Sequence, residues 1–584
     1  MTKYDYIKTI EARLSDADKR RYAEIFAPVE VAVPDADAWR GLCVMPDGRI
    51  RFYGHHDKKS VFDNDCAHCY IESTDGGLSW KKHVLPEKTE MEAAAFVPFA
   101  KPGSQYISVI GVPGEGTVAL IGKEPGDPGA RRVKITDEVF HSPFIPQVLE
   151  SRGRILVMTE REGTARQSNC IVPVVCYSDD LGESWTIVKL GEAPYHEITY
   201  PHKGYRWQQN NREITVEELS DGSLLMISRT STDYHYMSRS FDGGASWTAF
   251  EPTAFHSTGT MPKLKRLSDG RLILTWCNTK LLPELAGADG FWEDVFTNRD
   301  ANHIAISEDD GKSWIGMREM RLNPHRNAAD FRSVGGPECD RDKSVHQFEL
   351  LELPMGKLLV VSGQHYACRQ ISILDLNWIY ETARHEDFLH GLHALSTHNY
   401  VKSWLGGHRG SPANPNAFAG HCAYYRTSVS LLVPCPVRSG KESLSIIRSG
   451  DPRLVSGIGG AVWNFPTAKK GRVTIKAHIG EKGLRVSLLD YFMNPSDESV
   501  QYFADYTVVL RADMHDKDEF YSDFVLDFDC EAGICRLTNG DYLDLTMRMN
   551  GAHPYGLSYL HMQSAATEVD YEGSLVAELD FKKI

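Results

Sequence analysis

The 584-residue sequence lacks an apolar run of the roughly 18 residues that a membrane-spanning helix needs, so we expect no membrane partner. Its first residues are polar and charged and lack the apolar core of a secretory signal. We therefore expect a cytoplasmic protein, or a secreted one if a leader has been trimmed. The 12 cysteines are too few for a disulfide scaffold in a chain of this length.

Basic charge is also in deficit, with 64 Lys and Arg against 79 Asp and Glu and a net charge of −15. Nucleic-acid partners demand clustered positive charge, so we expect none. Glycine-rich phosphate loops, the serine-hydrolase elbow and the zinc-protease motif are absent from the sequence. No cofactor is therefore expected, and the oligomeric state stays open.

What the chain does contain is a repeat. Four octets share the pattern Ser-x-Asp-x-Gly-x-x-Trp, in a chain with 48 Gly and 11 Trp. The pattern predicts a hairpin turn in which Asp accepts backbone N–H groups, Gly takes a positive φ and Trp packs the turn onto its sheet. The octets are Ser73–Trp80, Ser178–Trp185, Ser240–Trp247 and Ser307–Trp314.

Paired strands around tight glycine turns precede these octets and predict four-stranded blades. One blade lacks the octet, and its strands lie in residues 91–137. A short strand at 28–35 would close the ring, and residues 5–26 predict a helix outside it. The six expected blades lie near 40–86, 91–137, 140–190, 212–252, 260–322 and 344–380.

The pattern changes after about residue 405. A linker-like stretch rich in Pro, Gly and Asn at 410–418 precedes short alternating strands without the octet, which predict a β-sandwich of the jelly-roll type. The expected fold is all-β, with a six-bladed β-propeller and a C-terminal sandwich. The expected divisions are 1–35 for the helix and closing strand, 36–404 for the propeller and 405–584 for the sandwich.

The four octets resemble the Asp boxes of the sialidase-like (BNR repeat) propeller superfamily of carbohydrate-active enzymes, and residues 40–380 resemble it throughout. Arg40 stands where that superfamily opens its first blade with an arginine. Glu213 and Arg229 match its glutamate at the start of one inner strand and its arginine at the end of the next strand. The resemblance implies a catalytic Glu213 and a substrate carboxylate held by Arg40 and Arg229.

The remaining sialidase positions have several candidates each. The resemblance implies a catalytic acid among Asp57, Asp63 and Asp65, and our assignment is Asp63. Tyr366 is the candidate nucleophile. A third carboxylate-binding arginine is expected among Arg299, Arg332 and Arg369.

Other residues are candidates for catalysis or binding because of their side-chain chemistry, without reference to the family. His346 begins the sixth inner strand and His55 ends a strand of the first blade, and histidine transfers protons near neutral pH. Trp207 and Tyr234 flank the Glu213 segment and would stack on sugar faces. A zinc set of His55, His56, Cys66 and Cys69 is conceivable, but no second Cys-x-x-Cys exists and we predict no metal.

In the C-terminal region, residues 461–466 and 555–563 resemble lectin-like sandwiches attached to glycosidase propellers. A packing domain that stiffens the propeller is the favoured interpretation of this region. Sugar binding is the alternative.

The predicted function is exo-hydrolysis of a terminal glycosidic bond in or next to an acidic sugar. The substrate is an anionic oligosaccharide or glycoside, because converging arginines match a carboxylate. Two alternatives stay open. The first is a lyase that cleaves a rhamnosyl–uronate type of linkage by β-elimination, for which His and Arg would supply base and cation. The second is a non-catalytic glycan-binding propeller.

Overall fold

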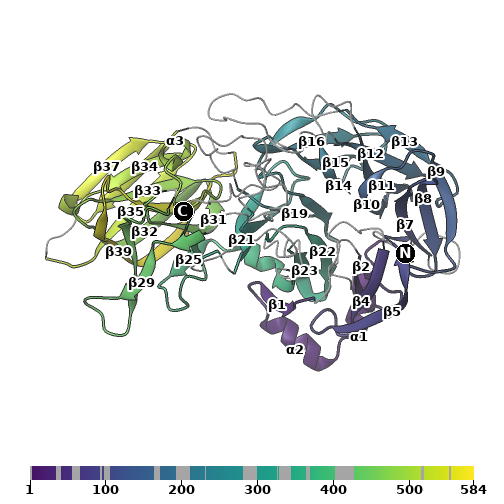
Figure 1. Ribbon diagram of the computed structural model, residues 1–584, viewed down its shortest axis with the longest axis horizontal. Helices are drawn as coiled ribbons and strands as arrows, with labels where there is room; N and C mark the ends of the chain where they lie inside the picture. Colours follow the sequence, from purple (N-terminus) through teal and green to yellow (C-terminus); the bar gives the residue numbers. More distant parts are fainter. Residues whose placement is uncertain are drawn as a thin grey trace.

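The computed structural model, drawn in Figure 1, is built almost entirely of β-strands. In the described part of the chain no helix is long and apolar enough to cross a membrane. The structure describes residues 3–34, 41–54, 66–91, 95–97, 105–162, 171–191, 211–230, 232–279, 299–324, 326–327, 344–363, 369–400, 426–454, 456–514, 518–550 and 554–584.

Six four-stranded antiparallel sheets surround a common centre, which confirms the expected propeller, including the blade without an octet (Figure 1). The first three blades are β2 (Leu42–Val44), β3 (Ile50–Gly54), β4 (Cys66–Ser73) and β5 (Lys81–Glu90); β6 (Ala95–Val97), β7 (Gln105–Val112), β8 (Gly116–Gly122) and β9 (Arg131–Thr136); and β10 (His141–Val148), β11 (Ile155–Glu162), β12 (Ile171–Ser178) and β13 (Thr186–Lys189). The next two are β14 (Arg212–Glu218), β15 (Leu224–Arg229), β16 (Tyr234–Ser240) and β17 (Glu251–His256); and β18 (Lys263–Arg266), β19 (Leu272–Trp276), β20 (Ala301–Ser307) and β21 (Ile315–Leu322).

The sixth blade joins the two ends of the propeller. Its strands β22 (Glu349–Leu353), β23 (Lys357–Ser362) and β24 (Gln370–Asp375) are completed by β1 (Val29–Ala32), which pairs with β24. This confirms the closing strand expected at 28–35. The closure ties residues more than 300 positions apart into one sheet, so that no blade edge is left open at the seam.

Each octet joins the third strand of its blade to the fourth, as the sequence pattern predicts. In the first blade the Asp75 carboxylate accepts the backbone N–H of Ser79 at 2.9 Å, and the Trp80 indole donates to the Gly77 carbonyl at 2.9 Å. A Cβ at Gly77, whose φ is +95°, would lie 2.8 Å from Leu359 of the sixth blade. The turn therefore packs against the preceding blade as well as its own.

The N-terminal segment forms two helices, α1 (Tyr6–Arg13) and α2 (Asp16–Glu24), where a single helix was expected over 5–26. The break has a local cause. Ser15 starts the second helix with a capping box, because its hydroxyl accepts the N–H of Asp18 at 3.2 Å and the Asp18 carboxylate accepts the N–H of Ser15 at 3.0 Å.

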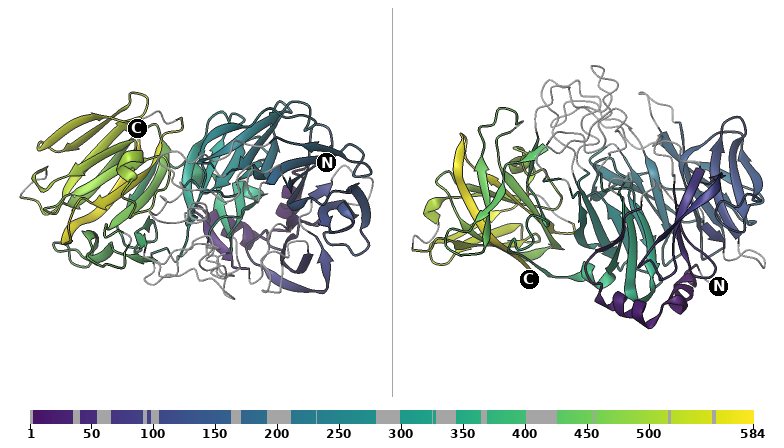
Figure 2. Two further views of the ribbon diagram at one scale, coloured as in Figure 1. Left: turned by 45° about the horizontal axis from the view of Figure 1, so that its top comes forward. Right: turned by 60° about the horizontal axis from the view of Figure 1, so that its bottom comes forward.

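These helices lie across one end of the propeller (Figure 2). We call this end the rear mouth, where the inner strands β2, β6, β10, β14, β18 and β22 end, and the opposite end the front mouth. Lys3 pairs with Glu217 at 3.3 Å, and the Tyr4 hydroxyl donates to the Arg266 carbonyl at 3.3 Å. Arg13 donates to the Asp47 carbonyl at 3.2 Å. The N-terminal segment therefore contacts the first, fourth and fifth blades at the rear mouth.

The C-terminal unit is a sandwich of two sheets, as expected. The larger sheet has the order β29 (Leu431–Pro434), β30 (Glu442–Arg448), β39 (Asp570–Lys583), β32 (Lys470–His478), β35 (Ser522–Asp529), β36 (Ile534–Asn539), β37 (Leu543–Arg548), with β25 (Ala383–Glu386) also paired to β39. The smaller sheet has the order β26 (Leu395–Ser396), β31 (Gly460–Ala468), β38 (Leu557–Ser564), β33 (Leu484–Leu489), β34 (Tyr506–Leu510). Beside them lie the pair β27 (His398–Tyr400) and β28 (Arg426–Ser428) and the short helix α3 (Val500–Phe503).

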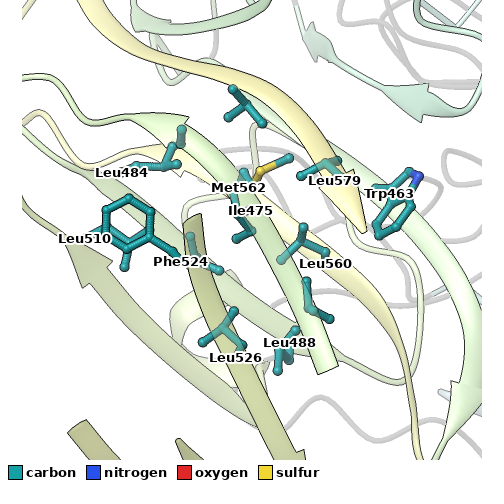
Figure 3. Close-up of a cluster of buried hydrophobic side chains, with 14 of the residues drawn as sticks. Trp463, Ile475, Leu484, Leu488, Leu510, Phe524, Leu526, Leu560, Met562 and Leu579 are labelled. Carbon is teal, nitrogen blue, oxygen red and sulfur yellow. The ribbon is translucent and has the colours of Figure 1, made fainter. Parts of the chain in front are cut away.

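The inner faces of both sheets form one apolar core, part of which Figure 3 shows. Leu484, Leu560 and Trp463 come from the smaller sheet, and Phe524 and Leu579 come from the larger one. The alternating pattern of β32 and β35, buried at every second position, places Ile475 and Phe524 inward.

Two strands that precede residue 405 already belong to the sandwich. β25 pairs with β39 and β26 pairs with β31. The expected division at 404/405 therefore falls inside the strands of the sandwich, which begin at Ala383. The linker-like stretch at 410–418 suggested the later division, and it lies outside the described residues.

The propeller and the sandwich meet along β21 and β31, which lie side by side (Figure 1). The Tyr559 hydroxyl donates to Glu319 at 2.8 Å and also bonds His303 Nε2. The Asn464 amide accepts the N–H of Glu319 at 3.0 Å and donates to the Met317 carbonyl at 3.2 Å. We call His303, Glu319, Asn464 and Tyr559 the interface cluster. The two segments that resemble lectins thus form β31 and β38, whose residues are buried.

Candidate active site

Strand direction gathers the described candidate residues at the front mouth. Neighbouring strands in a blade are antiparallel, so the start of the first strand, the end of the second and the start of the third share one end. Glu213 lies at the start of β14, Arg229 at the end of β15, and Arg299 just before β20. His346 and Arg369 precede β22 and β24 in the sixth blade.

Five other predicted site residues lie outside the described part of the chain: Arg40, His55, Asp63, Trp207 and Tyr366. Arg332, the alternative third arginine, also lies outside it, as do the alternative acids Asp57 and Asp65.

Glu213 and Arg229 form a buried ion pair, in which Nη1 of Arg229 donates to Oε2 of Glu213. Their side chains are 8% and 7% exposed. Burial lowers the pKa of Arg229, and the Glu213 carboxylate opposes that effect. The sequence pattern that singled out these two residues therefore corresponds to a direct contact between them.

A second buried pair lies beside the first and was not predicted. Glu160, in β11 of the third blade, is 1% exposed, and its Oε2 lies 3.1 Å from Arg212 Nη2. The other oxygen of Glu160 accepts the backbone N–H of Glu213. Burial acts to lower the pKa of Arg212, but the carboxylates of Glu160 and Glu213 outweigh it and raise that pKa. We call Glu160, Arg212, Glu213 and Arg229 the mouth cluster.

The backbone at Glu213 adopts an uncommon conformation. Its φ is +46°, in the left-handed region that non-glycine residues avoid. The register between β14 and β15 also shifts between Arg212 and Thr215, as at a β-bulge. Bulges and left-handed residues aim side chains at functional sites, and each costs about 1–3 kcal/mol unless its surroundings hold it. The hydrogen bond from the N–H of Glu213 to Glu160 stabilises this backbone conformation.

Arg299 and His346 form a separate buried contact between the fifth and sixth blades. Arg299 is 0% exposed, its Nη2 donates to the Gly259 carbonyl at 2.6 Å, and its Nη1 lies 3.1 Å from His346 Nε2. Because a guanidinium only donates, Nε2 of His346 accepts. The imidazole is therefore neutral with its proton on Nδ1, which donates to the Ser344 hydroxyl at 2.9 Å.

Arg369, the other described candidate for the third arginine, lies against the first blade. It is 1% exposed, and its guanidinium carbon lies 5.9 Å from the ring centroid of Phe52 in β3. A contact of this kind combines packing with a cation–π attraction.

The centre of the propeller holds charged pairs. A cavity of about 170 Å³ lies between inner strands of five blades. Lys263 pairs with Glu349 at 3.1 Å, and burial lowers the pKa of the neighbouring Lys265. Since the N-terminal segment covers the rear mouth, the front mouth is the end at which a ligand would reach the mouth cluster.

No group of three or more His, Cys, Asp and Glu side chains that could hold a metal ion occurs among the described residues. Of the conceivable zinc set, Cys69 is buried with its sulfur 3.5 Å from the Gly54 carbonyl oxygen. His55 and His56 lie outside the described residues, and the side chain of Cys66 is not described.

Residues 127–338 match the family model of a BNR repeat-like domain. The match runs from the second blade to the stretch after the fifth, and it confirms for this region the BNR repeats indicated by the octets. No curated protein sequence matches the chain.

Three solved structures resemble the chain at low similarity. Trypanosoma rangeli sialidase in complex with sialic acid is 10% identical, with a TM-score of 0.36 and coverage of 96% of this chain and 94% of that chain. The same sialidase in complex with 2,3-difluorosialic acid is 11% identical, with a TM-score of 0.34 and coverage of 93% and 91%. An exo-β-1,3-galactanase from Phanerochaete chrysosporium with β-1,3-galactotriose is 9% identical, with a TM-score of 0.28 and coverage of 95% and 100%.

Proposed function

We propose that the protein is a glycoside hydrolase that cleaves a terminal glycosidic bond in or next to an acidic sugar at the front mouth. The buried Glu213–Arg229 pair carries this proposal, because it lies at the start of an inner strand and at the end of the propeller opposite the N-terminal helices. Buried charges in a strained backbone are costly for stability alone and are typical of sites that perform chemistry.

In this proposal Arg229 binds the carboxylate of the sugar. A guanidinium has five N–H donors, so it can hold Glu213 and a substrate carboxylate at the same time. Arg40, from the sequence, is the proposed second cation. Arg299 lies deeper and supports the fifth and sixth blades through Gly259 and His346.

Glu213 is the proposed catalytic carboxylate. Positive charge develops on the sugar ring as a glycosidic bond breaks, and a nearby carboxylate stabilises it or activates the attacking group. The Glu213 side chain is only 8% exposed, and this low solvent access strengthens both effects. Asp63 and Tyr366 remain the proposed acid and nucleophile.

Hydrolysis is favoured over β-elimination by the state of His346. An elimination needs a base with an available lone pair beside the sugar proton. The lone pair on Nε2 of His346 accepts from Arg299, and Nδ1 carries the proton. His346 in this arrangement supports Arg299, so a lyase would need another base, for which the sequence offers His55.

The test is a screen of sialosides, rhamnosides and uronic-acid oligosaccharides in isotope-labelled water, with the products resolved by mass. We expect a product that carries one labelled oxygen, and we expect Glu213→Gln to abolish its formation. An unlabelled, unsaturated product that absorbs in the ultraviolet would instead identify a lyase. Binding of a glycan without any cleavage would identify a non-catalytic propeller.

A further inference from the structure

The inner strands of the propeller gather charged side chains around its central cavity. Two lysines and two glutamates line this cavity of about 170 Å³: Lys263 and Lys265 on β18, Glu217 on β14 and Glu349 on β22. Lys3 reaches Glu217 from the N-terminal segment. Three ammonium groups and two carboxylates therefore lie together at the centre of the propeller.

Ion pairs account for two of the three ammonium groups. Lys263 Nζ lies 3.1 Å from Glu349 Oε2, and Lys3 Nζ lies 3.3 Å from Glu217 Oε2. The ammonium group of Lys265 forms no ion pair with a described residue, although its side chain lines the same cavity. The ion pairs among the described residues therefore leave one cation at the cavity without an anion in contact.

The surroundings of Lys265 oppose its positive charge. Burial lowers the pKa of Lys265 and the other two ammonium groups act in the same direction, while Glu217 and Glu352 oppose them. Glu352 is bound elsewhere, because its carboxylate accepts the backbone N–H of Ser268 at 2.7 Å and the Ser268 hydroxyl at 2.6 Å. A buried cation is costly unless an anion contacts it, so Lys265 is a position at which an anion would bind favourably.

A neutral donor at the cavity also lacks a partner. Gln147, near the end of β10 in the third blade, lines the cavity, and its amide nitrogen is shielded from solvent without a hydrogen bond to a described residue. Leaving a buried N–H group unsatisfied is costly. An ammonium group and an amide N–H at one cavity are both donors, so their common ligand is an acceptor with negative charge.

The size and the walls of the cavity narrow the choice of anion. A volume of about 170 Å³ is enough for a small ion together with water molecules. The carboxylates of Glu217 and Glu349 lie in the same wall and would repel a doubly charged anion such as sulfate. A single negative charge matches the one ammonium group that has no ion pair.

We infer that the central cavity binds one monovalent inorganic anion of halide size, held by the ammonium group of Lys265 and the amide of Gln147. The bound ion neutralises Lys265 and gives the third and fifth blades a common partner at the propeller axis. Its role is to stabilise the ring of blades. The inference does not depend on the proposed function, because neither experiment below uses a substrate.

The first experiment locates the ion. Crystals of the full chain are soaked in sodium bromide, and anomalous diffraction is recorded at the bromine edge. We expect a peak in the central cavity within hydrogen-bond distance of Lys265 Nζ, and we expect Lys265→Met to lack it. A wild-type cavity without a peak would overturn the inference.

The second experiment measures the effect of the ion on stability in solution. Melting temperatures are compared in sodium chloride and in sodium gluconate, a much larger anion, at one ionic strength. We expect the chloride-minus-gluconate difference to be roughly 2 °C larger for the wild type than for Lys265→Met. The matched control is Lys312→Met, which changes an exposed lysine in the fourth octet and should behave as the wild type. Equal differences in all three proteins would contradict a stabilising ion at Lys265.

Discussion

The mouth cluster and the interface cluster are both buried groups of polar side chains, but they are built differently. The mouth cluster pairs two carboxylates with two guanidinium groups around a residue with φ of +46°. None of the four interface residues has a positive φ, although Met317 (φ +45°) and register shifts in β20 and β31 lie beside them. Burial favours the neutral forms of the two ionisable groups His303 and Glu319. Burial lowers the pKa of His303 to about 3 and raises that of Glu319 to about 7.

Under the proposed function, this difference separates a catalytic cluster from one that joins two domains. Neutral groups that satisfy one another's hydrogen bonds hold two domains together at little electrostatic cost. Full charges in a strained backbone cost more than they contribute to stability and persist where chemistry needs them. Substitutions in the two clusters should therefore differ, with losses of activity in the mouth cluster and losses of stability alone in the interface cluster.

The largest expected effect is on turnover. Glu213→Gln removes the proposed catalytic carboxylate from the mouth cluster, and we expect kcat to fall by roughly 10²–10⁴-fold. Glu319→Gln makes the same chemical change in the interface cluster and should leave kcat within about twofold of wild type. Steady-state kinetics on the best substrate from the screen provide the measurement, and equal losses in the two variants would remove the distinction between the clusters.

The next effect is on stability and concerns the unpredicted Glu160. Glu160→Ala leaves the Arg212 guanidinium buried without this partner, so we expect the free energy of unfolding to fall by roughly 3–5 kcal/mol. Urea denaturation measures it. We also expect kcat to fall more than KM rises, because Glu160 acts by positioning the backbone of Glu213.

Glu218→Ala is the control for Glu160. Glu218 is a buried carboxylate in β14 that accepts the backbone N–H of Glu150 at 2.7 Å at the rear mouth. Its loss should destabilise the fold without changing kcat. If Glu160→Ala and Glu218→Ala have the same kcat, Glu160 contributes only to stability and does not position Glu213 for catalysis.

The interface cluster should respond to pH. Burial raises the pKa of Glu319 from 4.5 to about 7, so the folded state holds a proton that the unfolded state releases between these values. Stability contributed by protonated Glu319 is therefore complete below pH 4.5 and declines as the pH rises to about 7, by about 3 kcal/mol in total. Melting temperatures of wild type and Glu319→Gln across this window test the sign. A wild type whose stability relative to the variant rises with pH would contradict the assignment.

The sequence predicted those structural features that depend on residues close together in the chain. Each octet contains its own donors and acceptors, such as Asp75 and the N–H of Ser79, so the turns and the blade order follow from local spacing. The closing strand β1 was predictable because a ring of blades leaves a single edge to fill. The capping box at Ser15 and Asp18 is equally local, but the prediction of one helix over 5–26 missed it and the break between the two helices that it causes.

Pairings between distant segments were not predictable. Glu160 meets Glu213 across 53 positions and two blades, and no motif links them. The partners of β39, which include β25 nearly 200 positions earlier, depend on how two sheets stack rather than on either strand alone. Strands were expected at 461–466 and 555–563, but the contacts of Asn464 and Tyr559 with the fifth blade could not be read from the sequence.

The smallest effect isolates the backbone at Glu213 from its side chain. Glycine in a strand is normally less stable than alanine by about 0.5–1 kcal/mol, because the unfolded chain gains freedom. At φ of +46° the order should reverse, since alanine is strained there and glycine is not. We therefore expect Glu213→Gly to be more stable than Glu213→Ala by about 1 kcal/mol. The same pair at Glu319, whose φ is not positive, should show the normal order. If alanine is the more stable substitution at both positions, the mouth cluster stores no backbone strain, and only its charges distinguish it from the interface cluster.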